Sequence, residues 1–161
     1  MFILALAFFV VFLDQITKQA VRSHLAFGES YPLIDGFFNL VYVRNDGAAW
    51  NILSGHGWVL ILTSLFVLGL LLRFRDSLFE TRGLFQQLLL GLLVGGILGN
   101  LIDRIRFGWV TDFLDFEFGT YHYPSFNVAD SAICISVALY FIHYLFFQKK
   151  EDKETIEVAG E

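Results

Sequence analysis

The sequence lacks the residue patterns that indicate a disulfide, a metal site or a nucleic-acid surface. Its one cysteine, Cys134, excludes an internal disulfide and lies in an apolar run, where we interpret it as a small hydrophobic side chain. The four histidines are dispersed and show no metal-ligand spacing. No acidic metal motif or Gly-Lys phosphate loop occurs, and a formal charge of -5 gives no basic field for nucleic acid.

Charged residues are also scarce, at 17%, whereas hydrophobic residues make up 56% of the chain. A soluble domain has about a quarter charged residues and roughly half apolar ones, so lipid is the expected solvent. Four apolar stretches approach the roughly 20 residues that cross a hydrocarbon core as helix. They are residues 2–25, 57–74, 84–102 and 128–147. We predict an all-α membrane protein with one integral-membrane domain, residues 1–148, and a charged tail, residues 149–161.

The first stretch is interpreted as a retained span, because no basic residue precedes it and no small-residue cleavage site follows it. Four spans place both termini on the same face of the membrane. Once the lysines and arginines inside polar motifs are set aside, the remaining ones favour that face slightly. The excess of positive charge on cytoplasmic loops then predicts cytoplasmic termini.

The two segments on the opposite face of the membrane contain more aromatic and β-branched residues than plain linkers need. Residues 37–43 are aromatic and β-branched and follow the turn-like pair Asp35-Gly36, which predicts a strand and a small extramembrane sheet. The second segment, residues 103–127, carries Phe113, Phe116, Phe118, Tyr121 and Tyr123 and is predicted to lie as a loop on the headgroup layer.

Glycines are concentrated in the third span, at positions 91, 95, 96 and 99. Helices in lipid gain no hydrophobic drive from association, so small residues that let backbones approach closely stabilise their packing. We predict that this helix packs tightly and holds the residues that follow it, Asn100 and Asp103, in fixed positions.

Polar residues gather at one face of the predicted membrane domain. Asp103 lies about 28 Å along the helix axis from Leu84, at the far end of the third span. Asp130 opens the fourth span, so the chain's direction places both aspartates on the same face. The same argument adds seven further polar residues, namely Asp14, Lys18, Asn45, Asn100, Arg104, Asp112 and Asn127.

Two neighbouring carboxylates cannot easily both ionise, and a shared proton lets such a pair hydrolyse an amide. The anion takes a proton from the attacking water while the acid donates one to the developing oxyanion. Asp130 lies near a helix start, which favours its anion, whereas Asp103 follows a helix end, which disfavours one. We therefore predict catalysis by Asp103 as the acid and Asp130 as the base.

Simpler interpretations remain for each group. Asp14 and Lys18 have the spacing of an i,i+4 ion pair. Residues 45–47 can form an ordinary hairpin turn. Asn100 can bond a neighbouring helix, and Arg104 can reach the headgroups. The two aspartates can be separately solvated. At the level of function, a small transporter or proton channel and a lipid-modifying transferase are the alternatives.

Five motifs together resemble the bacterial signal peptidase II family, the lipoprotein signal peptidases. They are Asp14-Gln15-Ile16-Thr17-Lys18, Asn45-Asp46-Gly47-Ala48-Ala49-Trp50, the run from Gly95 to Arg104, Val110-Thr111-Asp112-Phe113 and Phe126-Asn127-Val128-Ala129-Asp130-Ser131. The resemblance covers nearly the whole chain, from Asp14 in the first motif to Asp130 in the last. Trp50 departs from the pattern, because many relatives have Phe at that position.

The resemblance implies four transmembrane helices with a small extracytoplasmic β-cradle and a second outer loop. It implies an aspartic endopeptidase of the bacterial cytoplasmic membrane that needs no cofactor. Its substrates would be prolipoproteins, cleaved before the diacylglyceryl-modified cysteine, and a monomer in contact with membrane lipids is expected. Asp103 and Asp130 would be catalytic. The implied substrate-binding or structural residues are Asp14, Lys18, Asn45, Gly47, Asn100, Arg104, Asp112, Asn127 and Ala129.

Overall fold

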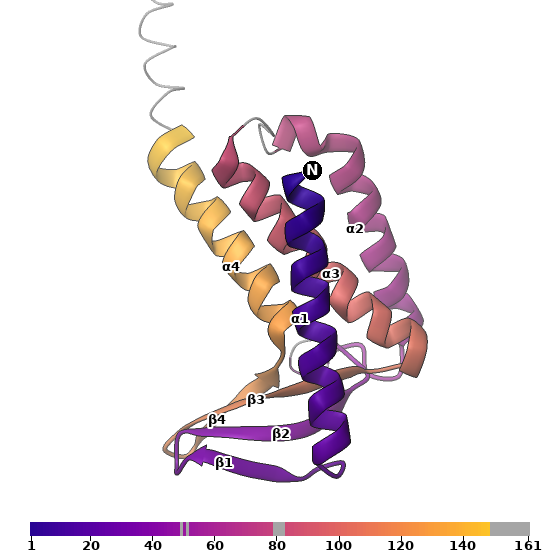
Figure 1. The fold of residues 1–161 in the computed structure, drawn as a ribbon, viewed down its shortest axis with the longest axis vertical. Coiled ribbons are helices and arrows are strands. Elements are labelled where there is room, and N and C mark those ends of the chain that lie inside the picture. Colours follow the sequence, from indigo (N-terminus) through magenta and orange to yellow (C-terminus); the bar gives the residue numbers. More distant parts are fainter. Residues whose placement is uncertain (49, 51, 79–82, 149–161) are drawn as a thin grey trace, which may run out of the picture.

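Four helices form a bundle in the computed structural model, which describes residues 1–48, 50, 52–78 and 83–148 (Figure 1). The helices are α1 (Phe2–His24), α2 (Gly57–Leu78), α3 (Leu84–Phe107) and α4 (Val128–His143), and a π-helical turn, Tyr144–Gln148, continues α4. All four are long and apolar enough to cross a membrane, α4 together with part of that turn. The four predicted spans are therefore confirmed. The predicted tail, residues 149–161, lies outside the described residues.

The third helix is longer than predicted. It was expected to end at residue 102, but α3 continues to Phe107 and ends at Gly108, whose φ of 82° is the left-handed conformation that terminates helices. The polar residues near its end were predicted to start a loop. Neighbouring elements instead supply their hydrogen-bond and ion-pair partners, so the helix continues. Asp103 consequently lies inside α3 rather than beyond its end, which corrects its predicted setting.

The second outer segment is also different from the prediction, because it forms strands instead of a loop. The second segment forms β3 (Val110–Phe118) and β4 (Tyr121–Phe126), and the first forms β1 (Ser30–Ile34) and β2 (Phe38–Asn45). They pair antiparallel in the order β1-β2-β3-β4 and form one sheet. The aromatic residues assigned to the headgroup layer therefore alternate along a strand hairpin.

The sheet lies at the end of the bundle where α1 and α3 finish and α4 begins (Figure 1). A small apolar cluster attaches it there: Val21 from α1 is buried against Tyr42 from β2 and Phe113 from β3. This contact fixes the inner strands of the sheet over the polar ends of the helices.

Glycines place α3 at the centre of the bundle, as its small-residue stripe predicted. A methyl group at Gly95 would lie 2.7 Å from Cβ of Val10 and 2.9 Å from the carbonyl oxygen of Ala7, both on α1. A methyl group at Gly96 would lie 2.5 Å from the carbonyl oxygen of Ala129 on α4. Only glycine permits both approaches without moving a helix.

We expect Gly95→Ala to lower the thermal unfolding midpoint of the detergent-solubilised protein, since the added methyl group meets backbone and Cβ atoms that cannot rotate away. Gly69→Ala is the matched control, because Gly69 is helical and has nothing within 4 Å of the added Cβ. The control should be neutral or stabilising, by up to about 1 kcal/mol from helix propensity. Equal midpoints for the two variants would contradict the packing role of Gly95.

Candidate active site

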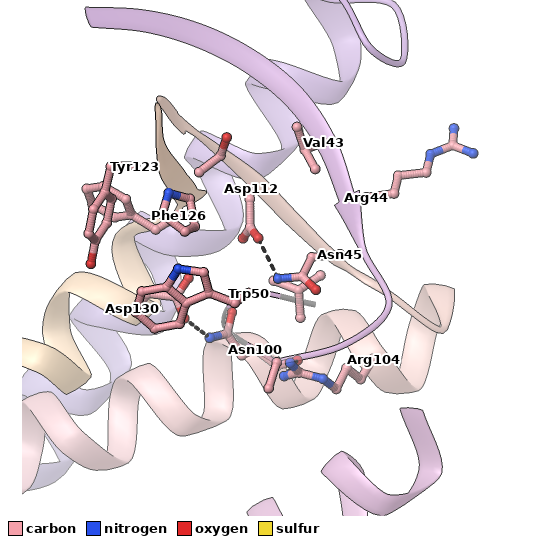
Figure 2. A pocket seen from close by; sticks show the side chains of 14 residues that line it. Val43, Arg44, Asn45, Trp50, Asn100, Arg104, Asp112, Tyr123, Phe126 and Asp130 are labelled. Carbon is pink, nitrogen blue, oxygen red and sulfur yellow. Dashed lines mark hydrogen bonds between the residues drawn. The ribbon is translucent and has the colours of Figure 1, made fainter. Parts of the chain in front are cut away.

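A cavity of about 500 Å³ lies between the helix ends and the sheet (Figure 2). Asp112 from β3 and Asp130 from α4 are the acidic side chains among the described residues that line it. Asn45, Asn100 and Arg104 supply its other main polar groups. Its remaining lining is Val43, Arg44, Ala48, Trp50, Val110, Tyr123, Pro124, Ser125 and Phe126. The cavity therefore combines two carboxyl groups with a partly aromatic wall.

Asp130 is held at the start of α4 by a capping box. The Asn127 side chain accepts a hydrogen bond from the backbone N–H of Asp130 at 2.9 Å, and the Asp130 carboxylate accepts one from the backbone N–H of Asn127 at 3.2 Å. Asn100 Nδ2 donates a third bond, 2.7 Å long, to Asp130 Oδ1. A helix N-terminus and two N–H donors stabilise negative charge at this carboxyl group.

Asp112 is more deeply buried, with 2% of its surface exposed. Its oxygens accept hydrogen bonds from Asn45 Nδ2 at 2.9 Å and Asn127 Nδ2 at 2.6 Å. Burial and, to a smaller extent, the charge of Asp130 raise the pKa of Asp112 to about 7, against the lowering effect of these two amides and of Lys18. Asp112 is therefore an acid that changes its protonation state near neutral pH.

Asn127 connects the two carboxyl groups directly. Its backbone N–H bonds Asp130 while its side-chain Nδ2 bonds Asp112. Because its Oδ1 is occupied by the backbone N–H of Asp130, the orientation of its amide is determined. This single fully buried side chain sets the position of one carboxyl group relative to the other.

Asn100 connects Asp130 to a buried lysine on α1. Lys18 Nζ donates to Asn100 Oδ1 at 2.9 Å, and an ammonium group can only donate. The Oδ1 atom must therefore face Lys18, which leaves Nδ2 facing Asp130. The lysine thus orients the amide that holds the carboxylate.

Asp14, Lys18 and Asp103 form a buried cluster beside the cavity, and none of the three has exposed surface. Lys18 Nζ lies 2.9 Å from Asp14 Oδ2 and 3.6 Å from Asp103 Oδ2. The predicted i,i+4 ion pair is therefore present. Asp14 Oδ1 also accepts the backbone N–H of Ala129 at 3.0 Å, which joins α1 to the start of α4.

Asp103, which was predicted to be the catalytic acid, is not among the cavity's lining residues. Its Oδ1 accepts from Gln15 Nε2 at 3.0 Å and its Oδ2 from the backbone N–H of Thr111 at 3.0 Å. Arg22 Nη1 also lies 3.6 Å from Oδ2. Both oxygens are therefore occupied, and the carboxylate balances buried cations instead of facing the cavity where Asp130 lies.

A hydrogen bond joins Arg104 on α3 to Gly47 in the loop that follows β2. Arg104 Nη2 donates to the carbonyl oxygen of Gly47 at 3.0 Å, and the backbone N–H of Gly47 donates to Asn45 Oδ1 at 3.0 Å. The loop therefore directs Asn45 Nδ2 toward Asp112. Arg104 faces the cavity, as Figure 2 shows, and so is not the headgroup contact that the simpler interpretation offered.

The structure thus gathers the predicted polar residues but divides them between two places. Asn45, Gly47, Asn100, Arg104, Asp112, Asn127 and Asp130 surround the cavity, whereas Asp14, Lys18, Asp103 and Ala129 join the helices behind it. Sequence reasoning missed Gln15, Arg22 and Thr111, which complete the cluster around Asp103. Gln15 and Thr111 lie inside the quoted motifs, the one signal that pointed to them.

Comparison with known proteins connects this arrangement to one family. A family model described as Peptidase_A8, signal peptidase (SPase) II, matches residues 6–146. A lipoprotein signal peptidase of Bacillus pumilus is 42% identical over 158 residues, which cover 96% of this chain and 99% of that protein. One of Syntrophus aciditrophicus is 44% identical, with 89% and 91% of the two chains covered. A solved bacterial membrane enzyme structure at 2.3 Å superimposes with a TM-score of 0.82 at 38% identity, covering 89% of this chain and 87% of that one.

We expect Asp103→Asn to destabilise the protein by about 3 kcal/mol, because it leaves the largely buried Arg22 without its carboxylate partner and Lys18 with Asp14 alone. The measurement is the thermal midpoint in detergent, compared with Asp130→Asn, which leaves the buried cations paired. Asp130→Asn should lower the midpoint less. An unchanged midpoint for Asp103→Asn would contradict the structural role assigned to this carboxylate.

The raised pKa of Asp112 predicts a pH dependence of stability. The folded protein keeps a proton on Asp112 up to a pH of about 7, whereas the unfolded chain loses it near the ordinary aspartate pKa of 3.8. The contribution of this proton to stability is complete below pH 3.8 and is lost as pH rises through 7, by up to about 1.4 kcal/mol per pH unit. The midpoint of the parent relative to Asp112→Asn should therefore fall between pH 5 and pH 7.

Asp46→Asn provides the control for this titration. A hydrogen bond from the Ser54 hydroxyl lowers the pKa of Asp46, so that carboxylate stays charged throughout this pH range. The midpoint difference between the parent and Asp46→Asn should be constant from pH 5 to pH 7. A constant difference for Asp112→Asn as well would show that Asp112 does not titrate near neutrality.

Proposed function

The chain belongs to the signal peptidase II family, and from that premise we propose that it cleaves prolipoproteins immediately before their diacylglyceryl-modified cysteine. Family membership and the four apolar helices indicate a multi-pass protease of the bacterial cytoplasmic membrane that removes signal peptides. The finer parts of the proposal are an aspartic mechanism, the pair of aspartates that carries it and the side of the membrane on which it acts.

We assign catalysis to Asp112 and Asp130. The observation that carries this assignment is the cavity, whose acidic lining among the described residues consists of these two side chains. Asn127 bonds both, and the charge of Asp130 raises the pKa of Asp112. Asp112 therefore replaces Asp103 as the partner of Asp130, because Asp103 is held by cations outside the cavity.

The surroundings give the two carboxyl groups different roles. Asp130 is half-buried, caps α4 and accepts two N–H groups, so it carries the negative charge. Asp112 is 2% exposed and has a pKa of about 7, so it carries the proton. A carboxyl oxygen that accepts one amide N–H retains a second lone-pair position, and Asp112 can be protonated there without losing either asparagine.

Hydrolysis then needs no covalent intermediate. Asp130 takes a proton from the water whose oxygen attacks the scissile carbonyl carbon, and Asp112 donates its proton to the carbonyl oxygen. The tetrahedral intermediate collapses when the C–N bond breaks. The proton on Asp130 passes to the leaving amine, and the hydroxyl proton of the intermediate returns to Asp112 as the new carboxyl group forms. The pair regains its starting protonation state.

The other motif residues act by position. Asn45, Asn100 and Asn127 hold the two carboxyl groups, and Gly47 and Arg104 hold the loop that carries Asn45. Behind them Asp14 and Lys18 join α1 to α4 at Ala129 and fix the amide of Asn100. None of these groups is required to accept the transferred proton.

We place the cavity on the extracytoplasmic face, with both termini in the cytoplasm, and we propose a monomer that works in contact with membrane lipids. The cavity lies where the helices end, so a substrate whose signal helix and acyl chains stay in lipid can present its scissile bond to water. Anchoring in the same bilayer raises the effective concentration of the substrate at the site.

We expect the purified protein to cleave a diacylglyceryl-modified prolipoprotein, and expect Asp112→Asn and Asp130→Asn each to reduce cleavage by at least about 100-fold, since each removes one general acid or base. Gel mobility of the precursor and mature forms measures the loss. Asp115→Asn is the matched control: Asp115 lies on the same strand but does not line the cavity, and its substitution should leave cleavage near the parent rate.

Two outcomes would contradict parts of this proposal. Normal turnover by folded Asp112→Asn, together with complete loss in folded Asp103→Asn, would return the catalytic role to Asp103. Equal cleavage of the unlipidated precursor would remove the proposed requirement for the modified cysteine. Each variant should be assayed below its own thermal midpoint, so that loss of activity is separated from loss of fold.

A further inference from the structure

Three arginines are stacked on aromatic rings where α1 and α3 end beside the sheet. The guanidinium carbon of Arg44 lies 4.7 Å from the ring centre of Phe27 and 4.7 Å from that of Trp109. Arg22 and Arg106 both lie over the Phe107 ring, at 4.8 and 5.0 Å. The ring centres of Phe107 and Trp109 are 5.9 Å apart, so these two rings connect the group around Arg44 to the group around Arg22 and Arg106. We call these six residues the arginine–aromatic face.

The positive charge of this face is only partly balanced. Arg22 has Asp103 as its carboxylate partner. Arg44 and Arg106 are exposed, and neither forms an ion pair within the part of the chain that the structure describes. The Arg44 side chain points away from the cavity, as Figure 2 shows, although its residue contributes to the cavity's lining. Two cations are therefore directed outward beside the proposed active site rather than into it.

The chemistry of the face suits a phosphodiester. A guanidinium group that stacks on a ring uses its flat side, so in-plane N–H groups remain to bind two phosphate oxygens together. Arg44 uses its Nε to bond the Tyr42 hydroxyl at 3.1 Å, which leaves its terminal nitrogens for such a ligand. Stacking also reduces the conformational freedom that each arginine would lose on binding.

The position of the face indicates which kind of molecule would supply that phosphate. Arg22 and Arg106 lie in the last turns of two membrane-spanning helices, and Phe27, Phe107 and Trp109 supply the aromatic rings that are enriched at a membrane–water interface. A net charge of -5 gives the chain no general attraction for soluble polyanions. A phosphate at this depth belongs to a lipid headgroup.

We propose that the arginine–aromatic face, through Arg44 and Arg106, binds the headgroup of an anionic phospholipid in the leaflet on the sheet side. The bound lipid would neutralise the two outward cations and hold the edge of the sheet at the level of the headgroups. The inference does not depend on which aspartates are catalytic.

The test compares phosphatidylglycerol with phosphatidylcholine. The parent protein is mixed with equal amounts of both lipids in detergent, and the bound lipids are counted by native mass spectrometry. We expect the parent to retain phosphatidylglycerol in preference, and the double variant Arg44→Gln/Arg106→Gln to lose that preference by about 25-fold, or roughly fivefold for each arginine. The preference should also weaken between 0.1 and 1 M salt, as the screening length falls from about 10 to 3 Å.

Arg73→Gln/Arg75→Gln is the control, because it removes the same charge from the last part of α2, at the far end of the bundle (Figure 1). It should keep the preference for phosphatidylglycerol. The proposal is overturned if the parent binds the two lipids equally, or if the control loses as much preference as the test variant. Displacement of the lipid by millimolar inorganic phosphate would instead identify a site for free phosphate and would also overturn it. Matching thermal midpoints in phosphatidylcholine would establish that both double variants are folded.

Discussion

The carboxylate of Asp14 is the point on which the rest of the site depends. Within α1 it pairs with Lys18 at 2.9 Å, and across the bundle it accepts the backbone N–H of Ala129 at 3.0 Å. It also contacts α3, since a methyl group at Gly99 would lie 2.7 Å from its Oδ2. One buried group therefore fixes three helices at the same depth. An unpaired charge at that depth would be costly in lipid, so all of these contacts have to form together.

From this junction a chain of hydrogen bonds extends to the cavity. Lys18 orients Asn100, Asn100 bonds Asp130, and Asn127 links Asp130 to Asp112. Each member has only one amide orientation that satisfies its neighbours, because ammonium and backbone N–H groups can only donate. The network therefore positions two carboxyl groups without placing a cation directly on either. Asp112 keeps a proton up to a pH of about 7, and we propose that Asp130 carries the negative charge beside it, the arrangement that acid–base hydrolysis requires.

The two groups of buried aspartates illustrate how environment separates residues of one type. Asp103 and Asp14 lie against cations and serve the packing of α1 on α3 and α4. Asp112 and Asp130 have amide donors and an open cavity instead. A carboxylate whose charge is neutralised by lysine and arginine is stable but poorly suited to exchange protons. The same fold thus contains a structural pair and a proposed catalytic pair, which are linked through Lys18 and Asn100.

The sequence by itself determined the four spans, because a run of about 20 apolar residues leaves few alternatives in lipid. It also determined that Asp103, Asp112 and Asp130 share one membrane face, since the chain's direction alternates with each span. Glycine spacing predicted the close packing of α3. The tertiary structure alone decided which aspartate lines the cavity with Asp130. That choice depends on the register that pairs Asp112 with Val43, and on the continuation of α3 to Phe107, which turns Asp103 toward Lys18. Both follow from contacts between segments far apart in the chain, which no local pattern records.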